Sequence, residues 1–257
     1  MIDINKFDKV LKKVEKPARY IGMEKNSIKK DLNKVKVKFA FAFPDIYEVG
    51  MSHLGLHILY NLLNQEEDIA CERVFAPWTD MEEEMTKENI PLFTLENREP
   101  IKNFDFVGFT LQYEMSYTNI INMLNLGGIP ILSKDRKEDS PFIIAGGPCA
   151  YNPEPLADII DFFVIGEGEE VTLEILKKYK ENKDAKASRL DFLKEISSIE
   201  GVYVPSFYQV VYKEDNTIDK MEPIVAGAPK TIKKRIIKDL HSVYYPEKLI
   251  LPYIETI

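Results

Sequence analysis

The sequence predicts an α/β fold with a doubly wound, mostly parallel sheet and a small β extension. Short apolar runs alternate with segments whose apolar residues recur at helical spacing, which is typical of βαβ units. Residues 39–43 read FAFAF, and such a fully apolar run indicates a strand buried on both faces, as in a parallel sheet. About five strand–helix units can be counted, too few for an eight-unit barrel, so a flavodoxin-like strand order fits best.

Residues 1–34 are expected to form a basic N-terminal helix and arm. Asp3 is the expected N-cap, and apolar residues follow it at helical spacing at Ile4, Phe7, Leu11 and Val14. Pro17 follows this helix, and residues 18–34 are expected to be irregular or weakly helical.

The α/β domain is expected to span residues 35–180. The apolar runs place its strands at residues 35–43, 69–75, 104–111, 141–145 and 161–165, with a short edge strand at 92–95. The helices are expected at residues 52–63, 78–88, 117–126 and 169–179, and Ser52 is the expected N-cap of the first.

A change of composition after Lys180 predicts a third region, residues 181–257. Residues 181–188 are polar, which is typical of a linker. Residues 201–225 alternate as in a β-hairpin around Asp215–Asn216, and we expect them to lie outside the parallel sheet. The rest, to Ile257, is expected to connect to a further domain, with the chain stopping before that domain begins.

Composition and charge limit the partners of the chain. No apolar run reaches the ~18 residues of a membrane span, and the N-terminus lacks a signal-peptide core, so we expect a cytoplasmic protein without membrane contact. The net charge of −8 combines +7 over residues 1–38, from twelve Lys and Arg against five Asp and Glu, with −15 over the remainder. The acidic body disfavours a broad nucleic-acid surface. The basic arm could contact RNA or an acidic partner, or it could be a solvated amphipathic helix.

The histidines and cysteines do not predict a metal site. His53 and His57 have the spacing of two metal ligands on one helix, but Leu54 stands where the HExxH motif has its glutamate, so packing or capping roles are expected. Cys71 and Cys149 are far apart in sequence and form no cluster, so we expect structural thiols.

Four loops are expected to meet at the carboxyl ends of the parallel strands, where doubly wound sheets bind ligands. We expect one crevice, with no assigned catalytic residue, lined by Asp45, Tyr47, Gly50, Gln112, Tyr113, Glu114, Gly146, Gly147, Pro148, Gly166, Glu167 and Gly168. The glycines would let a flat ligand approach the backbone, and the polar side chains of residues 112–114 would contact it. Ordinary strand-to-helix turns are the alternative interpretation.

A nucleotide phosphate does not suit this edge. The sequence contains neither GxxxxGK[ST] nor GxGxxG. Glu167, Glu169 and Glu170 lie at an expected helix start, where they complement the helix dipole and would repel a phosphate. A neutral, cationic or hydroxyl-rich ligand is expected instead.

Three segments of the sequence resemble the N-terminal region of radical S-adenosylmethionine (SAM) proteins that carry a cobalamin-binding-like domain. They are FPDIYEVGMSHLGLHILYNLL, FDFVGFTLQYEMSYTNI and IIAGGPCAYNPEPLADIIDFFVIGEGEE. The GGP at 146–148 and the GEGE at 166–169 are the most specific part. The likeness covers residues 17–180, weakens towards 257, and is strongest to a subfamily that opens with PARYIGME, here Pro17–Glu24.

The resemblance implies a cobalamin-binding-like α/β domain followed by a partial barrel in the same polypeptide. That barrel would hold a [4Fe–4S] cluster and SAM on a CxxxCxxC motif, which this chain lacks and which would follow Ile257. Cobalamin is the candidate cofactor. Tyr47 stands where the DxHxxG motif of cobalamin domains has its cobalt-ligating His, so a bound cobalamin would lack a His ligand from this loop.

Two functions remain open. In the first, the domain is part of a radical SAM enzyme and positions cobalamin or the substrate for methyl transfer or another radical modification. In the second, it is a cobalamin-free binding module that recognises a substrate or partner, RNA at the basic arm included.

Overall fold

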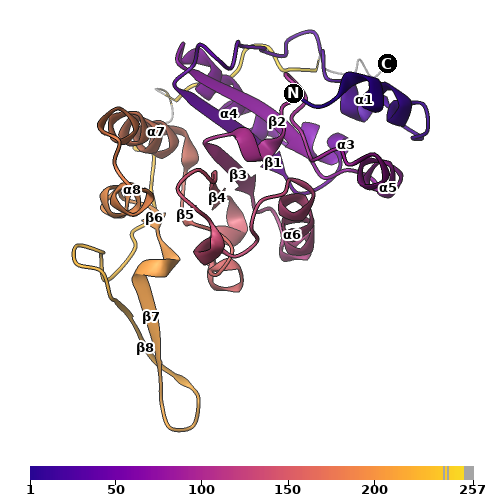
Figure 1. Cartoon of the computed structure of the whole chain (residues 1–257). Helices are drawn as coiled ribbons and strands as arrows, with labels where there is room; N and C mark the ends of the chain where they lie inside the picture. The colour runs from indigo at the N-terminus through magenta and orange to yellow at the C-terminus, as the bar shows by residue number, and fades with distance from the viewer. Residues whose placement is uncertain (240, 242, 252–257) are drawn as a thin grey trace, which may run out of the picture.

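A six-stranded sheet forms the centre of the computed structural model, which describes residues 1–239, 241 and 243–251 (Figure 1). Its order is β2-β1-β3-β4-β5-β6; the first five strands run parallel, and β6 pairs antiparallel with β5. The predicted doubly wound α/β fold with a flavodoxin-like order is therefore confirmed. The strands are β1 (Val37–Phe43), β2 (Ile69–Phe75), β3 (Phe106–Thr110), β4 (Phe142–Gly146), β5 (Phe162–Val164) and β6 (Val202–Tyr203).

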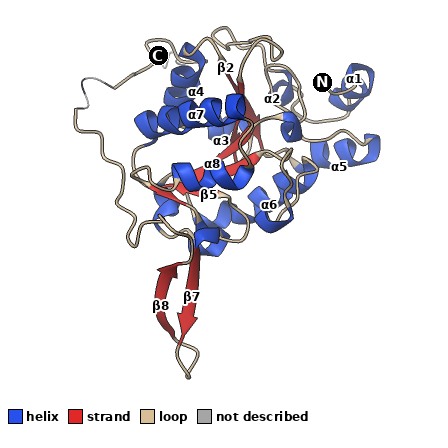
Figure 2. Ribbon diagram, turned by 60° about the vertical axis from the view of Figure 1, so that its left-hand side comes forward, coloured by secondary structure: helices blue, strands red, loops and turns tan. Residues whose placement is uncertain are grey.

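Helices cover both faces of this sheet (Figure 2). Successive side chains of a strand point to opposite faces, so Phe39 and Phe41 enter one core while Ala40 and Ala42 enter the other. The phenylalanine side is covered by α3 (Tyr47–Met51), α4 (Leu54–Gln65), α7 (Gly168–Ala185) and α8 (Arg189–Ile196). The alanine side is covered by α1 (Ile4–Leu11), α5 (Thr79–Glu88) and α6 (Tyr117–Leu126). Burial on both faces explains why β1 is almost wholly apolar.

The N-terminal helix is confirmed, with the Asp3 carboxylate accepting hydrogen bonds from the backbone of Asn5 and Lys6. A short helix, α2 (Ala18–Ile21), follows it. Short 3-10 turns lie in several connections of the described part of the chain: η1 (Ile101–Asn103), η2 (Glu114–Ser116), η3 (Ser133–Asp135), η4 (Pro148–Tyr151), η5 (Glu154–Leu156) and η6 (Pro205–Phe207). None of the helices within the described ranges is long and apolar enough to cross a membrane.

Two details of the α/β domain differ from expectation. The N-cap of α4 is His53 rather than Ser52, because residues 47–51 already form α3. Residues 92–95 make no strand of the sheet; Phe93 forms only an isolated bridge with Pro100.

The region after residue 180 differs more. The stretch 181–188 is not a linker, because α7 continues to Ala185 and Ser188 caps α8. Residues 201–225 do not all lie outside the sheet, because β6 extends its edge. The hairpin is confirmed as β7 (Tyr208–Tyr212) and β8 (Ile218–Pro223), with Asn216 in the left-handed conformation of its turn. The last part of the expected connector, residues 252–257, lies outside the described residues.

Candidate functional site

A cavity of about 330 Å³ lies between the sheet and helices α4 and α7. Its floor comes from β1, β3, β4 and β5 and reaches from the middle of the sheet to the carboxyl ends of the strands; it includes Phe39, Phe41, Gly108, Thr110, Ile144, Gly146 and Val164. Its roof includes Gly55, Leu59 and Leu63 of α4, and Gly168, Glu169 and Thr172 of α7. The walls are thus mostly apolar, as in sites that bind organic ligands.

Two neighbouring strands, β3 and β4, present glycine to the face that forms this floor. Gly108 lies beneath the Phe39 ring, and a Cβ there would stand 2.5 Å from its Cζ atom. Gly146 is less crowded, since a Cβ there would come no closer than 3.5 Å to the carbonyl oxygen of Val164. A glycine inside a strand marks close approach by another group, which at Gly108 is the Phe39 ring, so Gly108 serves packing and Gly146 leaves the open space; the sequence analysis did not single out Gly108. It also missed the roof residues Leu59 and Thr172.

Three polar residues, Thr110, Gln112 and His53, line the end of this cavity that borders a second hollow, and this end is referred to as its mouth. The Nε2 amide of Gln112 donates to the Thr110 hydroxyl at 2.6 Å. The backbone N–H of Leu56 donates to Nδ1 of His53 at 3.3 Å, which places the imidazole proton on Nε2. Burial lowers the pKa of His53, although the adjacent Gln112 opposes this effect. The imidazole at the mouth is therefore neutral at pH 7 and acts as a helix cap.

A second hollow of about 230 Å³ adjoins the first. The residues His53, Thr110 and Gln112 line both cavities and form a polar wall between them. Seven predicted site residues line the first cavity: Gln112, Gly146, Gly147, Pro148, Gly166, Glu167 and Gly168. Asp45 and Tyr113 line the second, together with Gln112.

The structure does not bring Tyr47, Gly50 or Glu114 to either cavity. The Tyr47 hydroxyl donates to the Glu24 carboxylate at 2.8 Å, and its ring packs edge-on against Phe75. Burial and the Glu24 carboxylate raise the pKa of Tyr47, so its phenol stays protonated. At Gly50 a Cβ would stand 2.3 Å from the Phe75 ring, so this glycine serves packing. Glu114 instead begins η2.

Two predicted site glycines approach the protein's own backbone. At Gly147, with φ +103°, a Cβ would lie 2.9 Å from the Leu111 carbonyl oxygen. At Gly166, with φ +109°, a Cβ would lie 2.2 Å from the carbonyl oxygen of Arg235. Arg235 donates its backbone N–H to Ile165 and accepts from Glu167, so the connector is hydrogen-bonded to a loop of the cavity.

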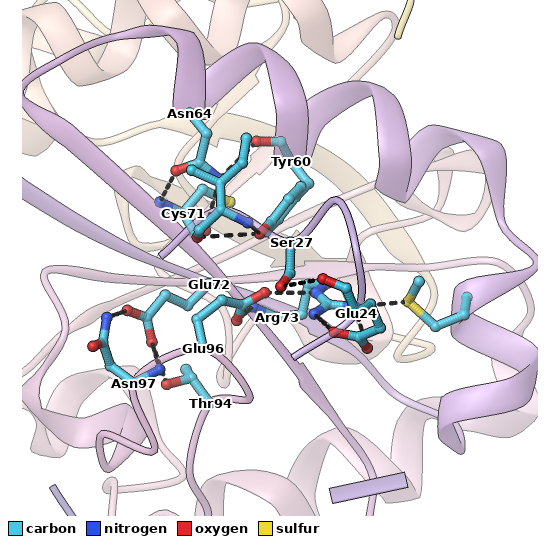
Figure 3. A network of polar contacts seen from close by, with 12 residues as sticks. Glu24, Ser27, Tyr60, Asn64, Cys71, Glu72, Arg73, Thr94, Glu96 and Asn97 are labelled. Atoms are coloured by element: carbon cyan, nitrogen blue, oxygen red, sulfur yellow. Dashed lines mark hydrogen bonds and ion pairs between the residues drawn. The ribbon is translucent and has the colours of Figure 1, made fainter. Parts of the chain in front are cut away.

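A buried ion network fastens the arm to β2 (Figure 3). The Arg73 side chain is fully buried and pairs with Glu24 of the arm and Glu96, each at 2.6 Å. Many cations of residues 1–38 likewise bind acceptors of this chain: Lys13 pairs with Glu84, Lys16 and Arg19 with Glu48, and Lys36 with Asp184. These pairs reduce the positive charge that the arm offers to another molecule.

The cysteines lie on opposite sides of the sheet. Cys71 is buried in the core beneath α4, and Cys149 packs, partly buried, against the other core. His53 caps α4, and His57 is buried with Nε2 2.8 Å from the Met51 carbonyl oxygen, which confirms their expected capping and packing roles. Within the described ranges, no group of three or more His, Cys, Asp or Glu could hold a metal ion.

Comparison with known proteins shows to which family the chain belongs. Residues 55–205, more than half of the chain, match the family described as radical SAM proteins, N-terminal. The chain belongs to this radical SAM N-terminal family. The matched range contains α7 and all of α4 except Leu54, and it includes every residue of α4 and α7 that lines the cavity.

One curated relative is an uncharacterized protein of Methanocaldococcus jannaschii, 31% identical over 144 residues. The aligned part is 54% of this chain but only 26% of the relative, so the chain spans about a quarter of that protein. No solved structure matches the chain significantly.

Proposed function

We propose that this domain binds a ring-bearing ligand in the cavity beneath α4 and α7 and positions it for a radical SAM centre in the same polypeptide. Cobalamin is the candidate ligand, and methyl transfer or another radical modification is the candidate chemistry. The observation that carries the proposal is a mostly apolar cavity with Gly108 and Gly146 in its floor and polar side chains at its mouth. It opens at the carboxyl ends of parallel strands, where doubly wound domains bind ligands.

The size of the cavity limits which part of a ligand it can enclose. A volume of about 330 Å³ suits one flat ring system but is too small for a corrin macrocycle. An aromatic base on a nucleotide tail would fit between the Phe41 and Ile144 side chains of the floor and Leu59 of the roof. A corrin would then lie outside the cavity, over the loops that contain Gln112 and Gly147.

The residues of this edge orient such a ligand without ligating its metal. When bound, cobalamin supplies a cobalt centre that can carry a methyl group. Tyr47 is turned towards Glu24, and Nδ1 of His53 is already the acceptor for the backbone of Leu56. The Nε2–H of His53 is therefore a hydrogen-bond donor beside the Gln112 side chain, and an amide or hydroxyl oxygen of the ligand would have to compete with Gln112 for it.

The [4Fe–4S] cluster and SAM are proposed to belong to the linked radical SAM domain. Such a cluster needs three closely spaced thiolates, whereas Cys71 and Cys149 occupy opposite sides of the sheet. The role proposed for the present chain is binding and placement.

Titration with hydroxocobalamin, followed by absorbance and calorimetry, tests this proposal. Gly168 lines the cavity, so the side chain introduced by Gly168→Leu would occupy part of it. The backbone should tolerate this change, because a Cβ at Gly168 meets only ordinary contacts, 3.6 Å from Leu59 and 3.7 Å from Thr172. The substitution should weaken binding at least tenfold, or about 1.4 kcal/mol. Ala185→Leu, at the exposed far end of the same helix, is the matched control and should bind like wild type. Equal affinity in all three proteins would show that cobalamin binds elsewhere or not specifically.

A cobalamin-free binding module is the second candidate function. One observation favours it. In the loop that follows β1, the Tyr47 hydroxyl donates to the Glu24 carboxylate of the arm, and the Tyr47 side chain lines neither cavity. If the wild-type chain binds no cobalamin under conditions in which it is folded, this second function replaces the first.

A further inference from the structure

The β7–β8 hairpin has one apolar face and one mostly polar face. Residues that pair directly across an antiparallel ladder lie on the same face. The pairs on one face are Tyr208–Pro223 and Val210–Met221, and beyond an irregularity in the register between Val211 and Tyr212 the pair Tyr212–Ile218 follows; all six residues are apolar or aromatic. The pairs on the other face are Gln209–Glu222 and Val211–Lys220.

The apolar face is open to solvent over its outer part. Tyr212 is 60% exposed, Ile218 62% and Met221 41%. The hairpin projects away from the body of the molecule in both views (Figures 1 and 2). A two-stranded hairpin is at best marginally stable by itself in water, so a partner that covers this face would stabilise it.

The base of the hairpin is firmly attached to the body. Phe207 is buried, the ring of Tyr208 lies 5.1 Å from that of Tyr203, and its hydroxyl donates to the Pro229 carbonyl at 2.7 Å. The backbone N–H of Ile224 closes the base on the Phe207 carbonyl at 2.8 Å. The body therefore holds the apolar face in a defined direction.

We propose that this face docks the radical SAM domain of the same polypeptide. This inference goes beyond the proposed ligand function and does not depend on the cavity. Its support is the length of polypeptide involved: the 144 aligned residues are only 26% of the curated relative, so a counterpart of all 257 residues of this chain would still leave about half of that protein to cover the face. A linked domain has an effective concentration in the millimolar range, which favours it over a second copy or an unlinked protein.

Amide hydrogen exchange on two proteins tests this proposal: the 257-residue chain and the full-length polypeptide that contains it. The amides of residues 209–212 and 218–222 should exchange at least tenfold more slowly in the full-length protein. The double variant Tyr212→Ser, Ile218→Ser should remove this difference. The matched control Gln209→Ser, Lys220→Ser changes the polar face of the same hairpin and should keep it.

Because the double variant could also weaken the hairpin itself, each variant is measured in both proteins, and only the difference between the two is interpreted. Small-angle scattering provides a second readout, in which the full-length double variant should be larger than wild type while the control is not. Equal hairpin exchange in the 257-residue chain and the full-length protein would overturn the proposal. So would protection that appears in the 257-residue chain only as its concentration rises, because that result identifies a second copy as the partner.

Discussion

The carboxylate of Glu24 holds both terminal nitrogens of the Arg73 guanidinium, with Oε1 2.9 Å from Nη1 and Oε2 2.6 Å from Nη2. This bidentate pair joins the PARYIGME segment of the arm to the second strand of the sheet. Both side chains are almost completely buried, so removing one partner leaves an incompletely compensated charge.

Glu24→Ala should lower the free energy of unfolding by about 3 kcal/mol, because breaking a buried ion pair is strongly destabilising. Urea unfolding monitored by circular dichroism measures the effect. The control is Glu48→Ala, which removes a largely exposed partner of Arg19 and should change stability by less than about 1 kcal/mol. Similar losses in the two variants would mean that the Arg73 network does not anchor the arm.

The same network has a defined response to acid. Burial acts to raise the pKa of Glu24, but its hydrogen bonds and ion pair with Arg73 outweigh burial and lower it. A lowered pKa gives stability that is present above the unfolded-state value and is lost as the pH falls through the folded-state value. We expect wild type to lose stability below about pH 4.5, and Glu24→Gln to lose less over the same range.

Glu72 should respond in the opposite direction. It is buried, its hydrogen-bond partners are the neutral side chains of Thr94 and Asn97, and burial raises its pKa. A raised carboxyl pKa gives stability that is complete below the unfolded-state value and is lost as the pH rises through the folded-state value.

Glu72→Gln mimics the protonated form, so it should be more stable than wild type at pH 8, by about 1 kcal/mol, and the gain should shrink towards pH 5. Unfolding midpoints at both pH values measure this. A loss of stability at pH 8 would mean that the ionised form is the one the fold requires.

Most strands of the α/β domain could be predicted because they are short apolar runs buried on both faces, as β3 and β5 are throughout. The twelve site residues could be placed at the carboxyl edge because each follows a predicted strand, and the strands of a parallel sheet all end on the same side. Their side-chain directions could not be predicted. Tyr47 turns away because Glu24, 23 residues earlier in the chain, offers its hydroxyl an acceptor.

The parts that could not be predicted depend on contacts between distant segments. Gly166 lies in a glycine-rich loop of the kind that admits a ligand close to its backbone. In the structure, however, the group that lies against Gly166 is the backbone of Arg235. Similarly, β6 has only two residues, too few for an alternating pattern, and it is a strand because β5 leaves an open edge beside it.

Gly166 provides a test of how firmly the connector is held. Gly166→Ala would place a Cβ 2.2 Å from the Arg235 carbonyl oxygen and should displace the connector. Residues 230–238 are rich in lysine, so we expect trypsin to cleave there at least tenfold faster than in wild type.

The matched control for backbone strain is Gly227→Ala. Gly227 also has a positive φ, +91°, but nothing lies within 4 Å of its Cβ position. It should therefore lose a little stability without faster cleavage at residues 230–238. Equal acceleration in both variants would show that strain alone, and not the contact with Arg235, controls access to the connector.

The stretch 181–188 provides the last prediction, because its polar composition indicates a linker and its structure is a helix boundary. The Ser188 hydroxyl accepts from the backbone N–H of Asp191, whose carboxylate in turn accepts from the backbone N–H of Ser188, a capping box that begins α8. The helix then packs Phe192 against Phe142 of β4, with ring centroids 4.8 Å apart. Ser188→Ala should therefore cost about 1 kcal/mol of unfolding free energy, as the loss of an N-cap does, whereas a serine in a linker could be replaced without effect. Ser198→Ala, an exposed serine just beyond the same helix, is the control and should change stability by less than about 0.5 kcal/mol. If denaturant unfolding shows no difference between the two variants, the capping box does not stabilise α8.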